Sequence, residues 1–286
     1  MTFDTISAGC NPDRNDDYVA LFSTANLTDI LVIDGATSVG GQDYVDPVRG
    51  DVAWFVQAFA AALEPMMASE RSQAESVQAA IDAVQLAFKA LIGDRAVPVF
   101  AWPIAALTWV RIARGDDASL ATLYSLGDCK TLLRGVDGPV YDPDPFFNPQ
   151  EAILQAEIAR LRTEGVHNAA QRRERLLPML RERRVAQNHS PAPSVLCLRP
   201  QGRFAARTCT FQLVPGTALL VMTDGFYRLV DPYGLYTDGQ LIGHCERRGL
   251  QSLLKELRGC ERGDGDTGEC AVKSADDASA VFCLVA

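Results

Sequence analysis

The sequence predicts an α+β fold, because strand-like and helix-like patterns occupy separate blocks of the chain. The clearest strand pattern is Ile30–Gly35, an apolar run rich in β-branched residues that stops abruptly at Asp34. Ala218–Gly225 repeats this design and stops at Asp224. The clearest helix pattern covers residues 72–93, where apolar side chains recur at helical spacing. The sequence therefore predicts two apolar strands that each end in a carboxylate.

Composition limits the class of protein. At 286 residues and 48% hydrophobic content, the chain can bury a large core, and we expect one domain over residues 1–286. The net charge of -9 argues against binding to nucleic acid or to an anionic membrane, which would repel the protein. The cysteines include no Cys-x-x-Cys pair, which favours reduced thiols and a cytoplasmic location. We also expect no secretory signal and no membrane-spanning segment, because no run of about 18 apolar residues occurs.

The segment around the first of these strands alternates loops and strands. Residues 10–17 form a polar loop that leads into a predicted strand at Tyr18–Phe22, so Asp17 lies at the entrance of that strand. After Asp34, the loop Ala36–Gly41 contains glycines that permit a tight turn. Both carboxylates are therefore expected where a strand meets a loop.

Two helices are predicted next. The dipeptide at 46–47 has the residue types of an N-cap and a first helical position, and apolar residues within 54–63 form one face. A Ser-x-x-Glu capping box at 72–75 begins the second helix, which ends at Gly93. Both apolar faces are typical of helices that pack on a core.

Strand patterns return in the middle of the chain, at Ile104–Ile112, Ser119–Leu126 and Thr131–Arg134. The segment between the last two, Leu126–Lys130, is predicted to be a hairpin turn with Asp128 at its centre.

Residues 150–190 are predicted to form a helical, arginine-rich insertion or flap. Within it, the stretch 171–184 contains six arginines and only two glutamates: Arg172, Arg173, Arg175, Arg181, Arg183 and Arg184 against Glu174 and Glu182. The simplest interpretation is a solvated helix face. The alternative is a docking surface for a phosphorylated partner, because this is the only dense basic cluster on an acidic chain.

The last part of the chain is predicted to contain strands at 195–198 and 208–214, followed by a helical pattern at 241–257 that glycine interrupts. Asp276 and Asp277 then open a final strand. This is a further strand end that carries carboxylates.

Asp-Gly occurs five times in the chain, and its commonest explanation is a plain turn. Asp34 and Asp224 differ from the other three in the long apolar run that precedes each one. A carboxylate at the end of a buried strand is costly unless a cation meets it. These two aspartates are therefore candidates for a functional site.

Aspartates stand at four separate strand ends: Asp17, Asp34, Asp224, and Asp276 with Asp277. If the strands are neighbours, the carboxylates converge, and they cannot all stay ionised without cations. Hard oxygen ligands without nearby histidine or cysteine select Mg²⁺ or Mn²⁺ over zinc or copper. Several bridging carboxylates suit two ions about 3.5–4 Å apart, which activate a water for attack on phosphorus. The sequence therefore predicts hydrolysis of a phosphoester.

These residues resemble the metal-dependent protein phosphatases of type 2C, and bacterial members in particular. Five short motifs occur in the family's order: Asn15–Asp17, Val32–Gly35, Leu126–Cys129, Met222–Gly225 and Asp276–Ser279. The resemblance implies a four-layer α-β-β-α sandwich of two antiparallel sheets flanked by helices, with the metal site in a cleft at one end. It also implies hydrolysis of phosphoserine or phosphothreonine by a metal-activated water, without a covalent intermediate.

The resemblance assigns roles to individual residues. The implied metal ligands are Asp17, Asp34, Gly35 (through its carbonyl), Asp128, Asp224 and Asp276. Asp34 would bridge two ions, Asp17 and Gly35 would serve one of them, and Asp224 with Asp276 would hold the other. Asp128 would help Asp224 to bind a third ion. Asp34, Asp224 and Asp276 are the expected catalytic residues.

The chain departs from the family pattern at several positions. The position of the family's phosphate-gripping arginine is Pro12, so the nearby Arg14 is the predicted substrate-binding residue. Ala36 stands where some members have histidine, and Asp277 replaces an asparagine and adds negative charge. No family flap aligns between Asp128 and Asp224, and the arginine-rich helix is a candidate replacement.

Three functions remain open on these residues. The first is a phosphoserine/phosphothreonine protein phosphatase that acts on a phosphorylated protein, with a cognate kinase as a further partner. The second is a non-catalytic phosphatase-like module that binds a phosphorylated partner. The third is a phosphatase for small metabolites.

Overall fold

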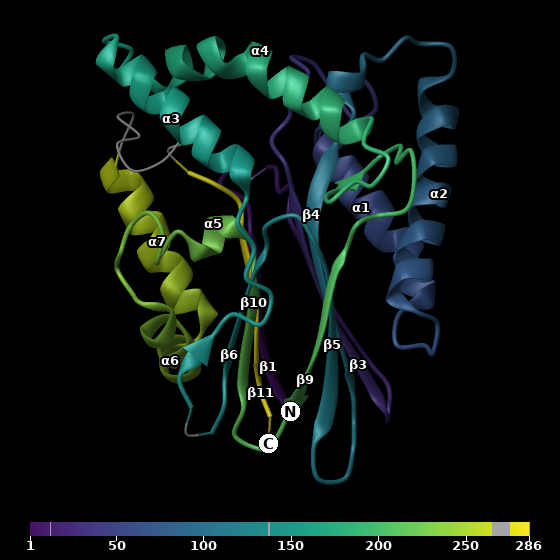
Figure 1. The fold of residues 1–286 in the computed structure, drawn as a ribbon, viewed down its shortest axis with the longest axis vertical. Helices are drawn as coiled ribbons and strands as arrows, with labels where there is room; N and C mark the ends of the chain where they lie inside the picture. Colours follow the sequence, from purple (N-terminus) through teal and green to yellow (C-terminus); the bar gives the residue numbers. More distant parts are fainter. Residues whose placement is uncertain (12, 137, 265–274, 286) are drawn as a thin grey trace.

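Two antiparallel sheets pack face to face in the structure, a computed structural model that describes residues 1–11, 13–136, 138–264 and 275–285. Helices cover the outer faces of both sheets, so the predicted four-layer α-β-β-α sandwich is confirmed (Figure 1). Both termini lie at one end of the sheets, and helices α3 and α4 cross the other end (Figure 1).

The first sheet has five strands in the order β1-β11-β10-β6-β7. Their bounds are β1 Thr2–Ala8, β6 Lys130–Arg134, β7 Val140–Tyr141, β10 Ala218–Met222 and β11 Ala278–Leu284. The second sheet has the order β2-β3-β4-β5-β9, and β8 pairs with β4. Its strands are β2 Tyr18–Ser23, β3 Leu27–Gly35, β4 Ile104–Ala113, β5 Ser119–Leu126, β8 Leu196–Cys197 and β9 Arg207–Leu213.

Strand β3 is buried on both of its faces, which explains its uninterrupted apolar sequence. Ile30 and Val32 pack into the core between the two sheets. Leu31 and Ile33 point the other way and pack in the core beneath the helices, with Phe55. The apolar run therefore passes through the middle of the sandwich and places Asp34 near the end of the strand.

Helices cover the second sheet on one side and the first sheet on the other (Figure 1). Those over the second sheet are α1 Asp51–Leu63 and α2 Gln73–Ile92, with short 3-10 turns η1 Glu64–Met66 and η2 Val99–Ala101. Those beside the first sheet are α5 Asp224–Tyr227, α6 Asp238–Arg248 and α7 Leu250–Asp264. The crossing pair is α3 Pro149–Thr163 and α4 Ala169–Asn188. In the part of the chain that the structure describes, none of these helices is long and apolar enough to cross a membrane.

The predicted start of α2 is confirmed, with Ser72 as its N-cap residue. The Ser72 hydroxyl accepts the Glu75 N–H at 3.3 Å and donates to the Glu75 carboxylate at 2.6 Å. The helix ends at Gly93, whose φ of 56° suits glycine.

The prediction that Leu126–Lys130 is a hairpin turn is wrong. β5 pairs with β4 and β9 in the second sheet, whereas β6 pairs with β10 and β7 in the first. The segment is therefore a passage between the sheets, and Gly127, at φ 80°, makes its sharp bend. A hairpin and an inter-sheet corner both use a tight turn, so the local sequence cannot separate them.

The prediction that residues 46–47 begin a helix is also wrong. Helix α1 begins at Asp51, after the N-cap residue Gly50. The Asp46 side chain accepts the backbone N–H groups two and three residues ahead, which closes a local turn instead. The Asp51 carboxylate accepts three backbone N–H groups from residues 44–46 and holds this turn against the helix.

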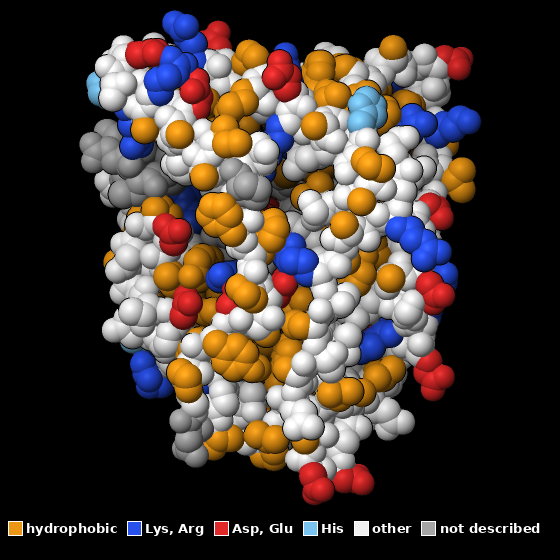
Figure 2. Space-filling model, viewed as in Figure 1, with side chains coloured by type: hydrophobic (Ala, Val, Ile, Leu, Met, Phe, Trp, Pro, Cys, Tyr) orange, Lys and Arg blue, Asp and Glu red, His pale blue; other side chains and the backbone are white. Residues whose placement is uncertain are grey.

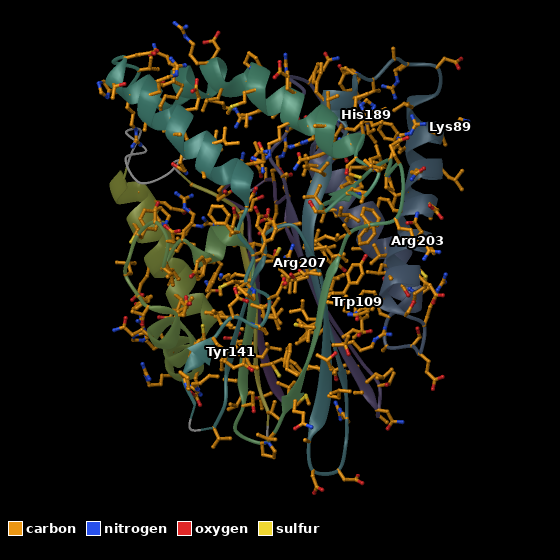
Figure 3. All side chains as sticks on the ribbon, in the orientation of Figure 1. Lys89, Trp109, Tyr141, His189, Arg203 and Arg207 are labelled. Carbon is orange, nitrogen blue, oxygen red and sulfur yellow. The ribbon has the colours of Figure 1, made fainter. Side chains whose placement is uncertain are left out.

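A buried ion pair anchors β3 upstream of Asp34. The Asp29 carboxylate is fully buried and accepts from Trp109 Nε1 at 2.8 Å, from Arg111 Nε at 2.8 Å and from the Ala68 N–H (Trp109 is labelled in Figure 3). Trp109 and Arg111 lie on β4, and Ala68 lies in the turn that follows η1. Asp29 therefore ties β3 to β4 and to the turn after α1.

We expect Asp29→Ala to lower the free energy of unfolding by about 3–5 kcal/mol, because it leaves Arg111 with a partly buried, uncompensated charge. Denaturant unfolding measures the change. The matched control is Arg49→Ala, which breaks the exposed Asp46–Arg49 pair and should cost less than about 1 kcal/mol. Equal losses in the two variants would contradict this role for Asp29.

Candidate metal centre

The end of β3 packs directly against the loop that precedes β2. A Cβ atom on Gly35 would lie 2.4 Å from the Asp16 carbonyl oxygen and 2.6 Å from Val52 Cγ1. Only glycine permits this approach. The glycine after Asp34 therefore serves to bring the Asp17 loop beside the strand end.

The second Asp-Gly motif shows the same arrangement. A Cβ atom on Gly225 would lie 1.9 Å from the Asp277 carbonyl oxygen and 3.3 Å from Asp276 Cβ. The start of α5, where Asp224 lies, is thus pressed against the start of β11. By contrast, a Cβ on Gly239 in another Asp-Gly pair would meet its nearest atom at 3.9 Å, an ordinary contact.

Asp224 was predicted to end the strand, but it lies just after the strand, at the start of a helix. β10 ends at Met222, and Asp224 is the first residue of the short helix α5. Thr223, between them, donates its hydroxyl to Asp17 Oδ2 at 3.1 Å, and its Oγ1 accepts the Ser279 N–H at 3.0 Å. This buried threonine therefore joins β10 to Asp17 and to β11.

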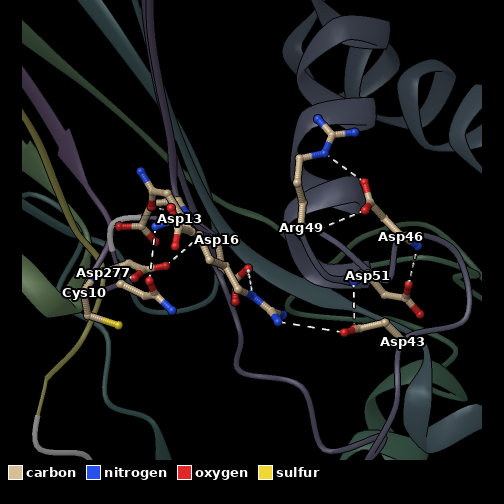
Figure 4. A network of polar contacts seen from close by, with 12 residues as sticks. Cys10, Asp13, Asp16, Asp43, Asp46, Arg49, Asp51 and Asp277 are labelled. Carbon is tan, nitrogen blue, oxygen red and sulfur yellow. Dashed lines mark hydrogen bonds and ion pairs between the residues drawn. The ribbon is translucent and has the colours of Figure 1, made fainter.

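Asp277 ties the β11 end to the polar loop. Its Oδ1 accepts the Cys10 N–H at 2.8 Å and its Oδ2 accepts the Asp16 N–H at 2.6 Å (Figure 4). Sequence reasoning assigned Asp277 only an additional charge beside the site. The structure shows that this carboxylate also holds the backbone of Cys10 and Asp16 in place. The Pro12 position falls outside the described residues.

The carboxylates of these segments repel one another electrostatically, and this shifts their pKa values. Burial raises the pKa of Asp34, and the nearby charges of Asp224, Asp17 and Asp276 raise it further. Burial likewise raises the pKa of Asp17, with further contributions from Asp277 and Asp276. The five aspartates predicted at four strand ends are therefore brought together at one end of the sandwich.

The Asp128 turn faces the same cluster. Burial raises the pKa of the neighbouring Cys129 thiol, and the charges of Asp34, Asp128, Asp17 and Asp224 raise it further. Asp128 itself is exposed, and its Oδ2 accepts from Asn148 Nδ2 at 3.3 Å. Arg207, labelled in Figure 3, donates to the Gly127 carbonyl at 2.8 Å and fixes the turn.

The donor set fits a hard divalent cation. Carboxylate oxygens and the Gly35 carbonyl are the ligands that Mn²⁺ and Mg²⁺ prefer, and the three histidines lie on other segments. Within the described residues, no three Asp, Glu, His or Cys side chains already have the arrangement of a complete metal site. The ligand assignment from the sequence stays a prediction.

A pocket of about 370 Å³ opens beside the carboxylates. Its walls include Gly35, Asp276 and the predicted substrate-binding residue Arg14. Arg14 Nε donates to Asp16 Oδ1 at 3.2 Å, and its Nη1 lies 3.9 Å from Asp43 Oδ2. Arg14 therefore lines the pocket, but acidic neighbours already balance its charge.

Sequence reasoning missed Arg173, which reaches the same pocket from α4. The solvated-face interpretation of the arginine-rich stretch is wrong for Arg172 and Arg184, which are buried. Arg173, Arg181 and Arg184 all donate to backbone carbonyls of residues 37–40. Their spacing of eight and three residues places them on one side of the helix, and this spacing was a usable signal.

Comparison with known proteins decides the family. The family model described as Protein phosphatase 2C matches residues 10–258 of this chain. The chain belongs to the protein phosphatase 2C family. As a member it is a metal-dependent serine/threonine phosphatase of a family that uses Mn²⁺ or Mg²⁺, as the resemblance of its motifs implied.

Solved structures show the same fold at low sequence identity. The S. agalactiae serine/threonine phosphatase has a TM-score of 0.55 and 12% identity, over 100% of this chain and 99% of that chain. The catalytic domain of PstP with 2 manganese ions has a TM-score of 0.51 and 16% identity, over 100% and 98%. RsbX in complex with magnesium has a TM-score of 0.50 and 13% identity, over 99% and 94%. None of the curated proteins matches this chain in sequence.

We expect Gly225→Ala to disrupt this phosphatase, because the new methyl group would overlap the Asp277 carbonyl and force Asp224 away from Asp276. Overpacking of this kind costs about 1–3 kcal/mol, and most of the activity should be lost. Thermal unfolding and hydrolysis of an aryl phosphate with Mn²⁺ measure the two effects.

Gly239→Ala is the matched control, because it alters another Asp-Gly pair that has room for a methyl group. It should change stability by less than about 1 kcal/mol, in the favourable direction expected for alanine in a helix. If Gly225→Ala behaved like Gly239→Ala, the close approach at Gly225 would have no functional role.

Proposed function

We propose that this phosphatase hydrolyses phosphoserine and phosphothreonine in proteins through a water activated by two Mn²⁺ or Mg²⁺ ions. The observation that carries the proposal is the crowding of Asp17, Asp34, Asp224 and Asp276 around one another, which raises the pKa of Asp34. Two ions bound there would supply an activated water and offset charge on the phosphoryl oxygens. The carboxylates would hold these ions.

The family resemblance suggests the individual roles. Asp34 is assigned to both ions, and the charges of three other carboxylates act on it. Asp17 and the Gly35 carbonyl are assigned to one ion, and Asp224 with Asp276 to the other. Asp128 is assigned with Asp224 to a third ion, as the family resemblance implies.

The substrate that we propose is a phosphorylated protein, and the second partner is the kinase that phosphorylates it. A pocket open at the end of the sandwich suits a side-chain phosphate presented on a protein segment. We also propose a cytoplasmic location. The free state of the seven cysteines in the described residues supports it.

Asp34→Ala and Asp224→Ala should each remove most of the hydrolysis of an aryl phosphate at saturating Mn²⁺. The loss should exceed the roughly 10–100-fold effect of residues that only support metal ligands. Chelator should abolish the wild-type rate. Asp116→Ala, which changes an exposed aspartate between β4 and β5, serves as the control and should retain the wild-type rate.

Turnover that is independent of metal, or unchanged in both variants, would overturn the mechanism. Strong phosphopeptide binding without hydrolysis at saturating Mn²⁺ would instead establish the non-catalytic module. A panel of phosphopeptides and sugar phosphates separates the remaining alternative, because a metabolite phosphatase would prefer the sugars.

Metal binding should also stabilise the fold. At a Mn²⁺ concentration about 100 times the dissociation constant, binding contributes about 2.7 kcal/mol, which raises Tm by roughly 5 °C. Asp34→Asn should raise the Tm of the metal-free protein, because it removes repulsion, and should largely abolish the Mn²⁺ effect. An equal Mn²⁺ effect in Asp34→Asn would place the ions elsewhere.

The Mn²⁺ effect on Tm should shrink as the pH falls. Burial and neighbouring charges raise the pKa of Asp17 and Asp34, so these carboxyls retain protons to a higher pH than usual. Mn²⁺ must displace those protons, so its binding weakens as the pH falls through the raised pKa of these carboxyls. Without metal the sign reverses: stability falls as pH rises through the raised pKa, because ionisation is more costly in the folded state.

A further inference from the structure

Two arginines that are far apart in the sequence line the pocket beside the candidate metal centre. Arg14 comes from the loop before β2, and Arg173 comes from helix α4. Asp16, Asp276 and Asp277 also line the pocket, so an anion that enters it meets several negative charges. Besides the proposed metal ions, a cationic side chain on this wall would therefore favour a bound phosphoryl group.

Arg14 is poorly suited to that task. Its guanidinium donates to Asp16 at 3.2 Å and lies 3.9 Å from Asp43, so its charge is already balanced. Arg173 is exposed and donates Nη2 to the Ser38 carbonyl at 2.9 Å. No ion pair between described residues includes Arg173. Its charge and its other donors can serve a ligand.

Helix α4 holds Arg173 in place through its other arginines. Each of the four successive carbonyls of 37–40 accepts from an arginine of α4: Arg184 at 3.2 Å, Arg173 at 2.9 Å, then Arg181 at 2.8 and 3.3 Å. The Arg181 guanidinium also lies 4.5 Å from the centre of the Phe100 ring. The helix is thus fixed on the loop that forms the pocket wall, and Arg173 is positioned before a ligand arrives.

We infer that Arg173 is a substrate-binding residue that contacts the phosphoryl oxygens of the substrate in this pocket. The inference rests on the proposed function and supplies its anion-binding group. A planar guanidinium already held by one backbone contact can offer two parallel donors to a phosphoryl group. The arginine-rich helix therefore completes the site instead of providing a separate docking surface.

The test compares Arg173→Ala and Arg173→Lys with Arg175→Ala, an exposed arginine on the same helix that does not line the pocket. Arg173→Ala should raise KM for both an aryl phosphate and a phosphopeptide roughly tenfold or more, with little change in kcat. It should weaken inhibition by inorganic phosphate to a similar extent. Arg173→Lys should restore part of the affinity, because it keeps the charge but not the fork. Arg175→Ala should match the wild type.

A second readout does not depend on turnover. Inorganic phosphate should raise the Tm of the Mg²⁺-loaded wild type and of Arg175→Ala, and should raise that of Arg173→Ala much less. Equal phosphate effects in the two alanine variants would overturn the role of Arg173 while leaving the proposed function intact. A loss of kcat and Tm in Arg173→Ala without a change in KM or phosphate affinity would also overturn it, since that result marks a structural role. If the wild type hydrolyses nothing, the proposed function fails, and the phosphate effect alone decides for or against Arg173.

Discussion

Repulsion among carboxylates is the constraint on which the site depends, and the fold supplies the force that opposes it. Two backbone contacts, at Gly35 and Gly225, bring four aspartate-bearing segments closer than any other residue type would permit. The apolar strands behind them are buried on both faces and cannot retreat without exposing core residues. Hydrophobic burial thus maintains a charge cluster that a divalent cation stabilises.

Further charged side chains hold the backbone that carries these aspartates. Arg258 donates to the carbonyls of Asp276 at 2.7 Å and of Ala8 at 2.8 Å. The buried Glu261 carboxylate accepts from Arg258 at 2.6 Å and from the Asp276 N–H at 3.2 Å. On the other side, Arg207 holds the Asp128 turn. Such partners orient metal ligands before the ion binds and limit the cost of ordering them.

The sequence predicted what local patterns determine. The strand that ends at Asp34 and the start of α2 at its Ser72 N-cap follow from apolar runs and capping residues, and the order of the aspartate motifs predicted the fold. It could not show that the Leu126–Lys130 turn joins two sheets. Whether a turn stays within one sheet depends on pairing with strands that are distant in the sequence, here β9 and β10. Nor could it distinguish a turn glycine from Gly225, since only the Asp277 carbonyl opposite makes glycine necessary.

The arginines of α4 show why charge patterning alone misleads. A basic stretch on an acidic chain suggests a solvated face or a docking surface, and Figure 2 shows basic and acidic side chains interspersed over the visible face. The carbonyls of residues 37–40 lie outside any strand and need donors, and guanidinium groups provide several donors each. Arg181 and Arg184 are used in this internal way. Arg173 lies on the same face of α4 and donates to the same loop. Because that loop forms part of the pocket wall, Arg173 also lines the pocket.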